Sequence, residues 1–148
     1  PVNAGGVRLV FVPAEVSVAP GEEFLLAVNV EAGKEKVDAV QISADYGSAA
    51  MEVLEIRAGE SLSTLLLNQF DNTAGTLDFA AGILPPAEPP TGTFKLADIR
   101  FLAKAESPQV DFSIHFEAPR QTGVFYQGTS LLDTGSLAGA RVTIKPNS

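Results

Sequence analysis

The chain has 148 residues, no cysteine, one histidine and a formal net charge of −8. That length allows one domain to bury a core without disulfides or metals, and the absence of cysteine excludes thiolate metal sites and cysteine catalysis. The negative charge argues against a nucleic-acid partner or an anionic membrane surface, and no apolar run reaches the roughly 18 to 20 residues that span a bilayer.

Short segments with strand-like patterns follow one another along the chain, separated by turns that contain Gly or Pro. The expected strands are residues 7–12, 15–18, 23–31, 37–46, 51–57, 65–70, 76–82, 93–103, 110–117, 123–127 and 138–145. This spacing is typical of a β-sandwich, and only residues 58–67 could form a helical turn or two. We therefore predict one all-β domain over residues 1–148.

The two ends of the chain are expected to lie outside the sandwich. Residues 1–6 and 146–148 are interpreted as remnants of linkers. Because the chain begins at Pro1 rather than at an initiator Met, we expect it to be a module of a longer protein.

Apolar and polar residues alternate within the expected strands, which indicates one buried and one solvated face. In residues 110–117 the polar face carries Asp111, Ser113, His115 and Glu117. The alternation predicts two packed antiparallel sheets. Their shared core is expected to include Phe24, Leu26, Val28, Ile42, Phe79, Phe101, Phe112 and Ile114.

Two expected strands change phase in the middle. The apolar positions move from even to odd numbers near Ala97 and Asp98, and from odd to even numbers between Val53 and Leu54. One extra residue in one strand of a pair, a β-bulge, produces this change and also bends the strand. Curved strands of this kind favour a jelly roll.

The order of several motifs resembles the cohesin modules of cellulosome scaffoldins, which bind dockerin modules. The motifs are "APGEEFLLAVNVE", "VDAVQISADYG", "MEVLEIRAGESL", "FDNTAGTLDFAAG", "TGTFKLADIRFLAKA" and "ARVTIKP", and they extend over nearly the whole chain. Tyr46, Gly47 and Ser48 stand where the family usually has Tyr-Asp-Pro. That departure also allows a cohesin-like module outside any cellulosome.

The resemblance implies a two-sheet jelly-roll sandwich of about nine strands, with a flat face that captures a dockerin. The strands of that face would be residues 37–46, 65–70, 76–82 and 110–117. The alternation places these residues outward on the face: Ala39, Gln41, Ser43, Asp45, Asp78, Ala80, Asp111, Ser113 and His115. Phe125 and Tyr126 could add an apolar rim for the partner.

The resemblance also implies the setting of the module. We expect an extracellular or cell-surface location as part of a larger secreted protein, and a monomer when the module is isolated. No cofactor is expected on this chain, and calcium, if present, is expected on the dockerin. Asp71 and Asn72 are first of all turn-forming residues, and they supply few carboxylates for a calcium site of their own.

Two other functions stay open from the sequence. A carbohydrate-binding module shares the architecture, but sugar platforms use exposed aromatic rings, and the chain has no Trp and two Tyr. A structural spacer in a surface protein is the other alternative. An enzyme is the least favoured reading, because nothing in the spacing supplies His115 with a nucleophile or a paired carboxylate.

Overall fold

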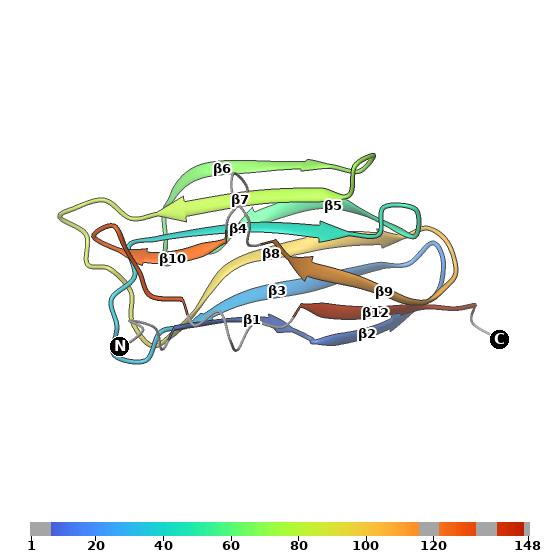
Figure 1. The fold of residues 1–148 in the computed structure, drawn as a ribbon, viewed down its shortest axis with the longest axis horizontal. Coiled ribbons are helices and arrows are strands. Elements are labelled where there is room, and N and C mark those ends of the chain that lie inside the picture. The colour runs from blue at the N-terminus through green and yellow to red at the C-terminus, as the bar shows by residue number, and fades with distance from the viewer. Residues whose placement is uncertain (1–6, 116–121, 133–138, 147–148) are drawn as a thin grey trace.

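The computed structural model describes residues 7–115, 122–132 and 139–146 (Figure 1). The described residues form strands and no helix, and therefore no helix that could cross a membrane. In chain order the strands are β1 (Arg8–Val12), β2 (Glu15–Val18), β3 (Glu23–Glu31), β4 (Ala39–Tyr46), β5 (Met51–Ala58), β6 (Thr64–Asp71), β7 (Thr76–Gly82), β8 (Thr93–Ala103), β9 (Ser107–Ile114), β10 (Gly123–Tyr126), β11 (Thr129–Ser130) and β12 (Ala140–Ile144).

The strands build two sheets, which confirms the all-β sandwich. The smaller sheet has the order β1-β3-β8-β5. The larger sheet has the order β11-β10-β4-β9-β12-β2, with β7 on the other edge of β4 and β6 beyond β7. Figure 1 shows β6, β7, β4, β9, β12 and β2 in front of the smaller sheet.

Two details of the sheets differ from the prediction. The pairing is not antiparallel throughout, because β12 and β2 run parallel. The described residues form twelve strands rather than about nine. β1 and β2 are separate strands, as the sequence predicts, and they divide at Pro13: β1 pairs in the smaller sheet and β2 in the larger one, and proline has no N–H to continue a ladder. The two-residue strand β11 was not expected at all.

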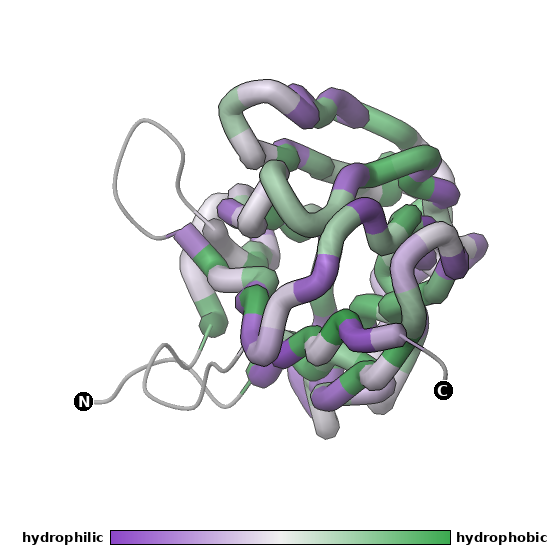
Figure 2. Tube along the Cα trace, turned by 90° about the vertical axis from the view of Figure 1, so that its right-hand side faces the viewer, coloured by the Kyte–Doolittle hydropathy of each residue, from purple (hydrophilic) through white to green (hydrophobic). Residues whose placement is uncertain are grey.

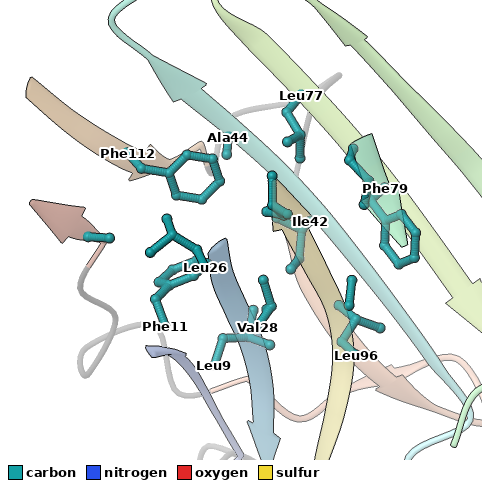
Figure 3. Close-up of a cluster of buried hydrophobic side chains, with 14 of the residues drawn as sticks. Leu9, Phe11, Leu26, Val28, Ile42, Ala44, Leu77, Phe79, Leu96 and Phe112 are labelled. Carbon is teal, nitrogen blue, oxygen red and sulfur yellow. The ribbon is translucent and has the colours of Figure 1, made fainter. Parts of the chain in front are cut away.

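The core lies between the two sheets, as the alternation predicted (Figure 3). Of the eight core residues named from the sequence, seven are buried, and Ile114 is partly buried against the core. Phe101 stacks on Phe24 with ring centroids 5.2 Å apart and meets Phe112 edge-on at 5.6 Å. Tyr46 also meets Phe101 edge-on, at 6.0 Å. These aromatic contacts join both sheets.

Both predicted phase changes are β-bulges. The register of β8 against β3 shifts between Val28 and Asn29, so that Leu96 is the extra residue. The register of β5 against β8 shifts between Val53 and Glu55, so that Leu54 is the extra residue. Residues 58–67 form no helical turn; they hold the end of β5, a bend and the start of β6.

Candidate protein-binding face

Four strands of the larger sheet lie side by side in the order β6-β7-β4-β9, as expected for the predicted face. The central strand β4 pairs with β7 from Ala39 to Asp45 on one edge. On its other edge it pairs with β9 at residues 44–46 and with β10 at residues 39–41. The four strands therefore form one continuous surface on the side of the sheet away from the core (Figure 1).

β9 and β10 follow one another along the same edge of β4, and Thr122 bridges the step between them. The Ser43 carbonyl accepts a hydrogen bond from the His115 N–H at 2.7 Å. The Thr122 hydroxyl accepts one from the Ser43 N–H at 2.9 Å and lies 3.0 Å and 2.9 Å from the carbonyls of Ser43 and His115. At this point of β4 the Thr122 hydroxyl accepts the hydrogen bond that a carbonyl of a neighbouring strand would normally accept. The expected strand 110–117 ends at Ile114, and Glu117 lies outside the described residues.

Not all of the predicted face residues of β4 and β7 are accessible. Ala39, Gln41, Asp45 and Asp78 are partly exposed on the outer side. Ser43 has 0% exposure and Ala80 has 7%, so the prediction that both are accessible contacts is wrong for this structure. Both lie in the middle of the sheet, where longer neighbouring side chains shield a side chain of one or two heavy atoms from solvent. The Ser43 hydroxyl has no hydrogen-bond partner among the described residues.

The predicted face residues of β9 are accessible to solvent, as expected. Asp111 and Ser113 are exposed and His115 is partly exposed, at the end of the described part of this strand. Asp111 accepts hydrogen bonds from the Gln109 side chain at 3.2 and 3.3 Å. The β9 end of the face therefore presents a carboxylate and a hydroxyl to solvent.

Only one of the two predicted rim aromatics belongs to the face. The Phe125 ring covers Gly123, where an added Cβ would lie 2.5 Å from the ring, and Phe125 pairs with Ala39 on the outer side. Tyr126 packs partly buried against the core instead. Alternation along β10 explains the difference, because successive side chains point to opposite sides of a strand.

The sequence reading did not name any face residue of β6. Pairing with β7 places Leu67 beside Ala80, Gln69 beside Asp78 and Asp71 beside Thr76 on the outer side. The "DNTAG" turn fixes the pairing of the strands on either side of it, so it could have predicted Asp71 opposite Thr76 and Gln69 opposite Asp78. The outward position of Leu66 could not be predicted from the turn, because a β-bulge between Leu65 and Leu67 changes the register.

The turn between β6 and β7 is held by Asp71 and Gly75, as expected of turn formers. One Asp71 carboxylate oxygen accepts hydrogen bonds from the N–H groups of Thr73 at 2.8 Å and Ala74 at 3.1 Å. These bonds lower the pKa of Asp71. Gly75 has φ of 75°, and an added Cβ would lie 2.3 Å from the Tyr46 carbonyl oxygen, so this position requires glycine.

A shallow hollow of about 530 Å³ lies beside this turn, lined by Gln69, Phe70, Asp71, Asn72, Thr76 and Asp78. Its carboxylates, amides and hydroxyl can accept hydrogen bonds from a partner and attract a cation. Among the described residues no group of three or more His, Cys, Asp or Glu side chains is arranged to hold a metal ion.

No family model matches the chain, and no curated protein matches it. Solved structures with the same fold do. The chain is similar to CaCohA2 from Clostridium acetobutylicum, with a TM-score of 0.79 at 15% identity over 97% of this chain and 94% of that one. It is also similar to a cohesin module from a family 33 glycoside hydrolase of Clostridium perfringens, with a TM-score of 0.71 at 16% identity over 99% and 100%.

A third structure of this fold contains a partner. It is the Coh-OlpC–Doc435 type I cohesin–dockerin complex from Clostridium thermocellum, whose TM-score is 0.79 at 11% identity over 99% of this chain and 98% of that one. These similarities show that the chain has the jelly-roll fold of cohesin modules, as the motif order suggested.

Proposed function

We propose that this chain is a non-catalytic recognition module that binds a dockerin-type protein on the outer face of β6, β7, β4 and β9. The observation that carries the proposal is that these four strands are neighbours and present one continuous outer surface. Proteins of the same fold have been solved with dockerins bound. A dockerin is therefore the class of partner that this face fits best.

The composition of the face supports a protein partner. Ser43 and Ala80 are small and buried in the middle of the face, which keeps its centre low, so that a helix backbone can approach the sheet closely. Gln41 and Asp78 stand partly exposed beside these small residues and can accept hydrogen bonds from Lys, Arg, Ser or Thr side chains. Small residues beside a few polar groups favour a flat interface rather than a deep ligand pocket.

We place the module in the setting that this function requires. It would act outside the cell or at the cell surface, as part of a larger secreted protein, to assemble or anchor proteins there, including polysaccharide-degrading enzymes. The isolated module would be a monomer. This chain would carry no cofactor, and any calcium in the complex would be bound by the dockerin.

The carbohydrate-binding alternative is weakened by the position of the tyrosines. The chain has no Trp, and one of its two Tyr residues, Tyr46, is only 6% exposed in the core. A sugar platform would therefore lack the stacked rings that normally build it. The structural spacer is the remaining alternative to a recognition module.

A titration distinguishes the recognition module from the spacer. Dockerin modules encoded in the same genome would be produced singly and titrated calorimetrically against this chain. We expect one-to-one binding by at least one of them, with the amide shifts of the ¹⁵N-labelled chain concentrated on β4, β7 and β9. Absence of binding across all of these dockerins would favour the spacer.

A further inference from the structure

β6 is an open edge of the larger sheet. It pairs with β7 on one side, and no strand among the described residues pairs with its other side. Outside the ladder with β7, the backbone of residues 64–70 makes no further hydrogen bond within the described part of the chain. Figure 1 shows β6 as the outermost strand, at the top of the molecule. Its open side therefore presents N–H and C=O groups with which another strand can pair.

β6 is also the most apolar part of the exposed surface. None of its eight residues is buried. Leu65, Leu66 and Phe70 are 52%, 61% and 38% exposed, and they are three of the six large apolar side chains that are exposed in the described chain. Figure 2, turned by 90° about the vertical axis, keeps this edge at the top and shows hydrophobic segments there among hydrophilic ones. Exposed apolar side chains that gather on one strand indicate a contact surface.

Leu65 and Phe70 lie on the inner side of β6, because their partners across the ladder are core residues of β7. Asn68 lies between them on the same side and donates a hydrogen bond to the Ile56 carbonyl of β5 at 3.0 Å. The smaller sheet ends at β5, and both apolar side chains stay exposed. We call Leu65 and Phe70 the inner patch. An added strand beside β6 would cover it and extend the core.

The other sheet edges in the described part of the chain are short or covered. β11, β2 and β1 contain two, four and five residues. On β5 the side-chain amides of Asn68 and Asn72 bind the Ile56 carbonyl and both backbone groups of Val53. β6 instead has eight residues, no Pro, Lys or Arg, and a single charged side chain, Asp71 at its end. Natural edge strands are usually short, charged or covered, so this edge is typical of a strand-pairing site.

One protective feature is present on β6, and it affects only one end. The register against β7 shifts between Leu65 and Leu67, and a β-bulge of this kind disrupts pairing locally. From Leu67 to Asp71 the pairing with β7 is regular. Five regular residues are the length of a common β-strand, so the bulge leaves room for an additional strand.

We propose that the open edge of β6 is a second binding site, which takes an extended segment of another polypeptide as an additional strand with apolar side chains on Leu65 and Phe70. Open backbone groups select an extended partner, because the backbone groups of a helix are already paired within the helix. The net charge of −8 disfavours a second copy of this chain and favours an uncharged or basic segment. The site uses the edge and the inner side of β6, so it does not rest on the proposed function of the outer face.

Two synthetic peptides test the site. The first alternates Val and Thr over about eight residues, with a Lys at each end, so that its Val side chains share one side of a strand. The second has the same sequence with N-methyl groups on every Val and Thr amide, which keeps the side chains and removes the hydrogen-bond donors. Each is titrated into the ¹⁵N-labelled chain up to about 1 mM, a range that detects weak binding.

We expect the unmodified peptide to shift the amides of residues 64–71 and to slow hydrogen exchange at the β6 amides that face the open edge. The N-methylated peptide should do neither, because it cannot donate to the β6 carbonyls. Phe70→Lys and Leu65→Lys should each weaken the unmodified peptide about tenfold or more, since a charge then lies in the inner patch. Leu25→Lys is the matched control, because Leu25 is 54% exposed on the smaller sheet. Thermal melts check that each variant is folded.

Equal binding of the two peptides, shifts that lie away from β6, or no binding at about 1 mM would overturn the proposal. Self-association of the free chain in sedimentation, abolished by Phe70→Lys, would overturn the choice of partner, because β6 would then pair with a second copy. The Phe70→Lys variant should bind a dockerin as the unchanged chain does, since Phe70 lies on the inner side of β6. The failure of this site is therefore distinguishable from the failure of the outer face.

Discussion

The side-chain amide of Asn72 pairs with the backbone of Val53 as a strand peptide would. Its Oδ1 accepts a hydrogen bond from the Val53 N–H at 2.8 Å, and its Nδ2 donates one to the Val53 carbonyl at 2.9 Å. The Tyr46 hydroxyl donates to the same Oδ1. Because β5 is an edge strand of the smaller sheet, Asn72 satisfies backbone groups that lack a neighbouring strand there, and it links the β6–β7 turn to the other sheet.

Replacement of Asn72 by Ala should therefore destabilise the fold. We expect a loss of about 1 to 3 kcal/mol, because two backbone groups of Val53 lose their partners. Urea denaturation followed by fluorescence or circular dichroism measures the change. Asn29→Ala on β3 is the matched control and should change stability by less than about 0.5 kcal/mol. Equal losses in both variants would contradict the role assigned to Asn72.

Tyr46 should titrate at unusually high pH. Burial, together with the negative charges of Asp71 and Glu52, raises the pKa of Tyr46 to about 12. The folded state thus holds the proton more tightly than the unfolded state, whose tyrosine pKa is about 10. The resulting contribution to stability is present in full below about pH 10 and is lost as the pH rises towards 12. Ultraviolet titration of Tyr126→Phe, which leaves Tyr46 as the only tyrosine, measures this, and a midpoint near 10 in the folded protein would contradict it.

The alternation of apolar and polar residues predicted much of this fold, because burial of one strand face depends only on local sequence. Phe24, Phe79 and Phe112 are buried as expected. The bulges in β5 and β8 were also visible as phase changes, since a bulge moves the apolar positions by one residue. The parallel pairing of β2 with β12 was not visible, because it depends on a contact between residues more than 120 positions apart.

The candidate face was predicted less completely than the core. Local alternation assigned Ser43 to the correct side of β4, but its accessibility depends on neighbouring strands that alternation does not describe. The same limit applies to Leu66, whose outward position follows from a bulge inside the run "TLLL". Thr122, which has no strand pattern of its own, joins β9 to β10 only through tertiary hydrogen bonds.

Loss of the hydroxyl should change the free energy of unfolding at Thr122 but hardly at Ser43. Thr122→Val removes the oxygen that accepts the Ser43 N–H and contacts two carbonyls, so we expect a loss of about 1 to 3 kcal/mol. Ser43→Ala removes a buried hydroxyl without a partner among the described residues, and should be neutral or slightly stabilising. Denaturation gives both values, and hydrogen exchange at the Ser43 amide should accelerate in Thr122→Val. A destabilised Ser43→Ala would show that its hydroxyl is satisfied.

Phe79 should matter for stability. Its ring is 1% exposed between the sheets, so Phe79→Ala should cost about 3 to 5 kcal/mol through the cavity that it leaves. Denaturant titration measures this cost. Gln41→Ala is the control, since Gln41 lies on the outer side of the adjacent strand β4 and is partly exposed. A cost for Phe79→Ala below about 1 kcal/mol would mean that the core closes over the cavity.

Gln41 and Asp78 should matter for binding rather than for folding. They lie on adjacent strands, on the same side of the sheet, with Ala80 opposite Gln41 and Ser43 opposite Asp78 in the register. Replacement of either by Ala should weaken a dockerin-type partner by about 1 to 3 kcal/mol, the usual cost of removing a buried hydrogen-bonding group from an interface. Calorimetry against the partner, paired with thermal melts, separates this effect from any loss of stability. Glu31→Ala on the smaller sheet, which loses only an exposed pair with Arg8, should leave affinity unchanged. If neither Gln41→Ala nor Asp78→Ala changes affinity, the partner contacts another surface of the module, and the loop region around Phe125 would be the next to test.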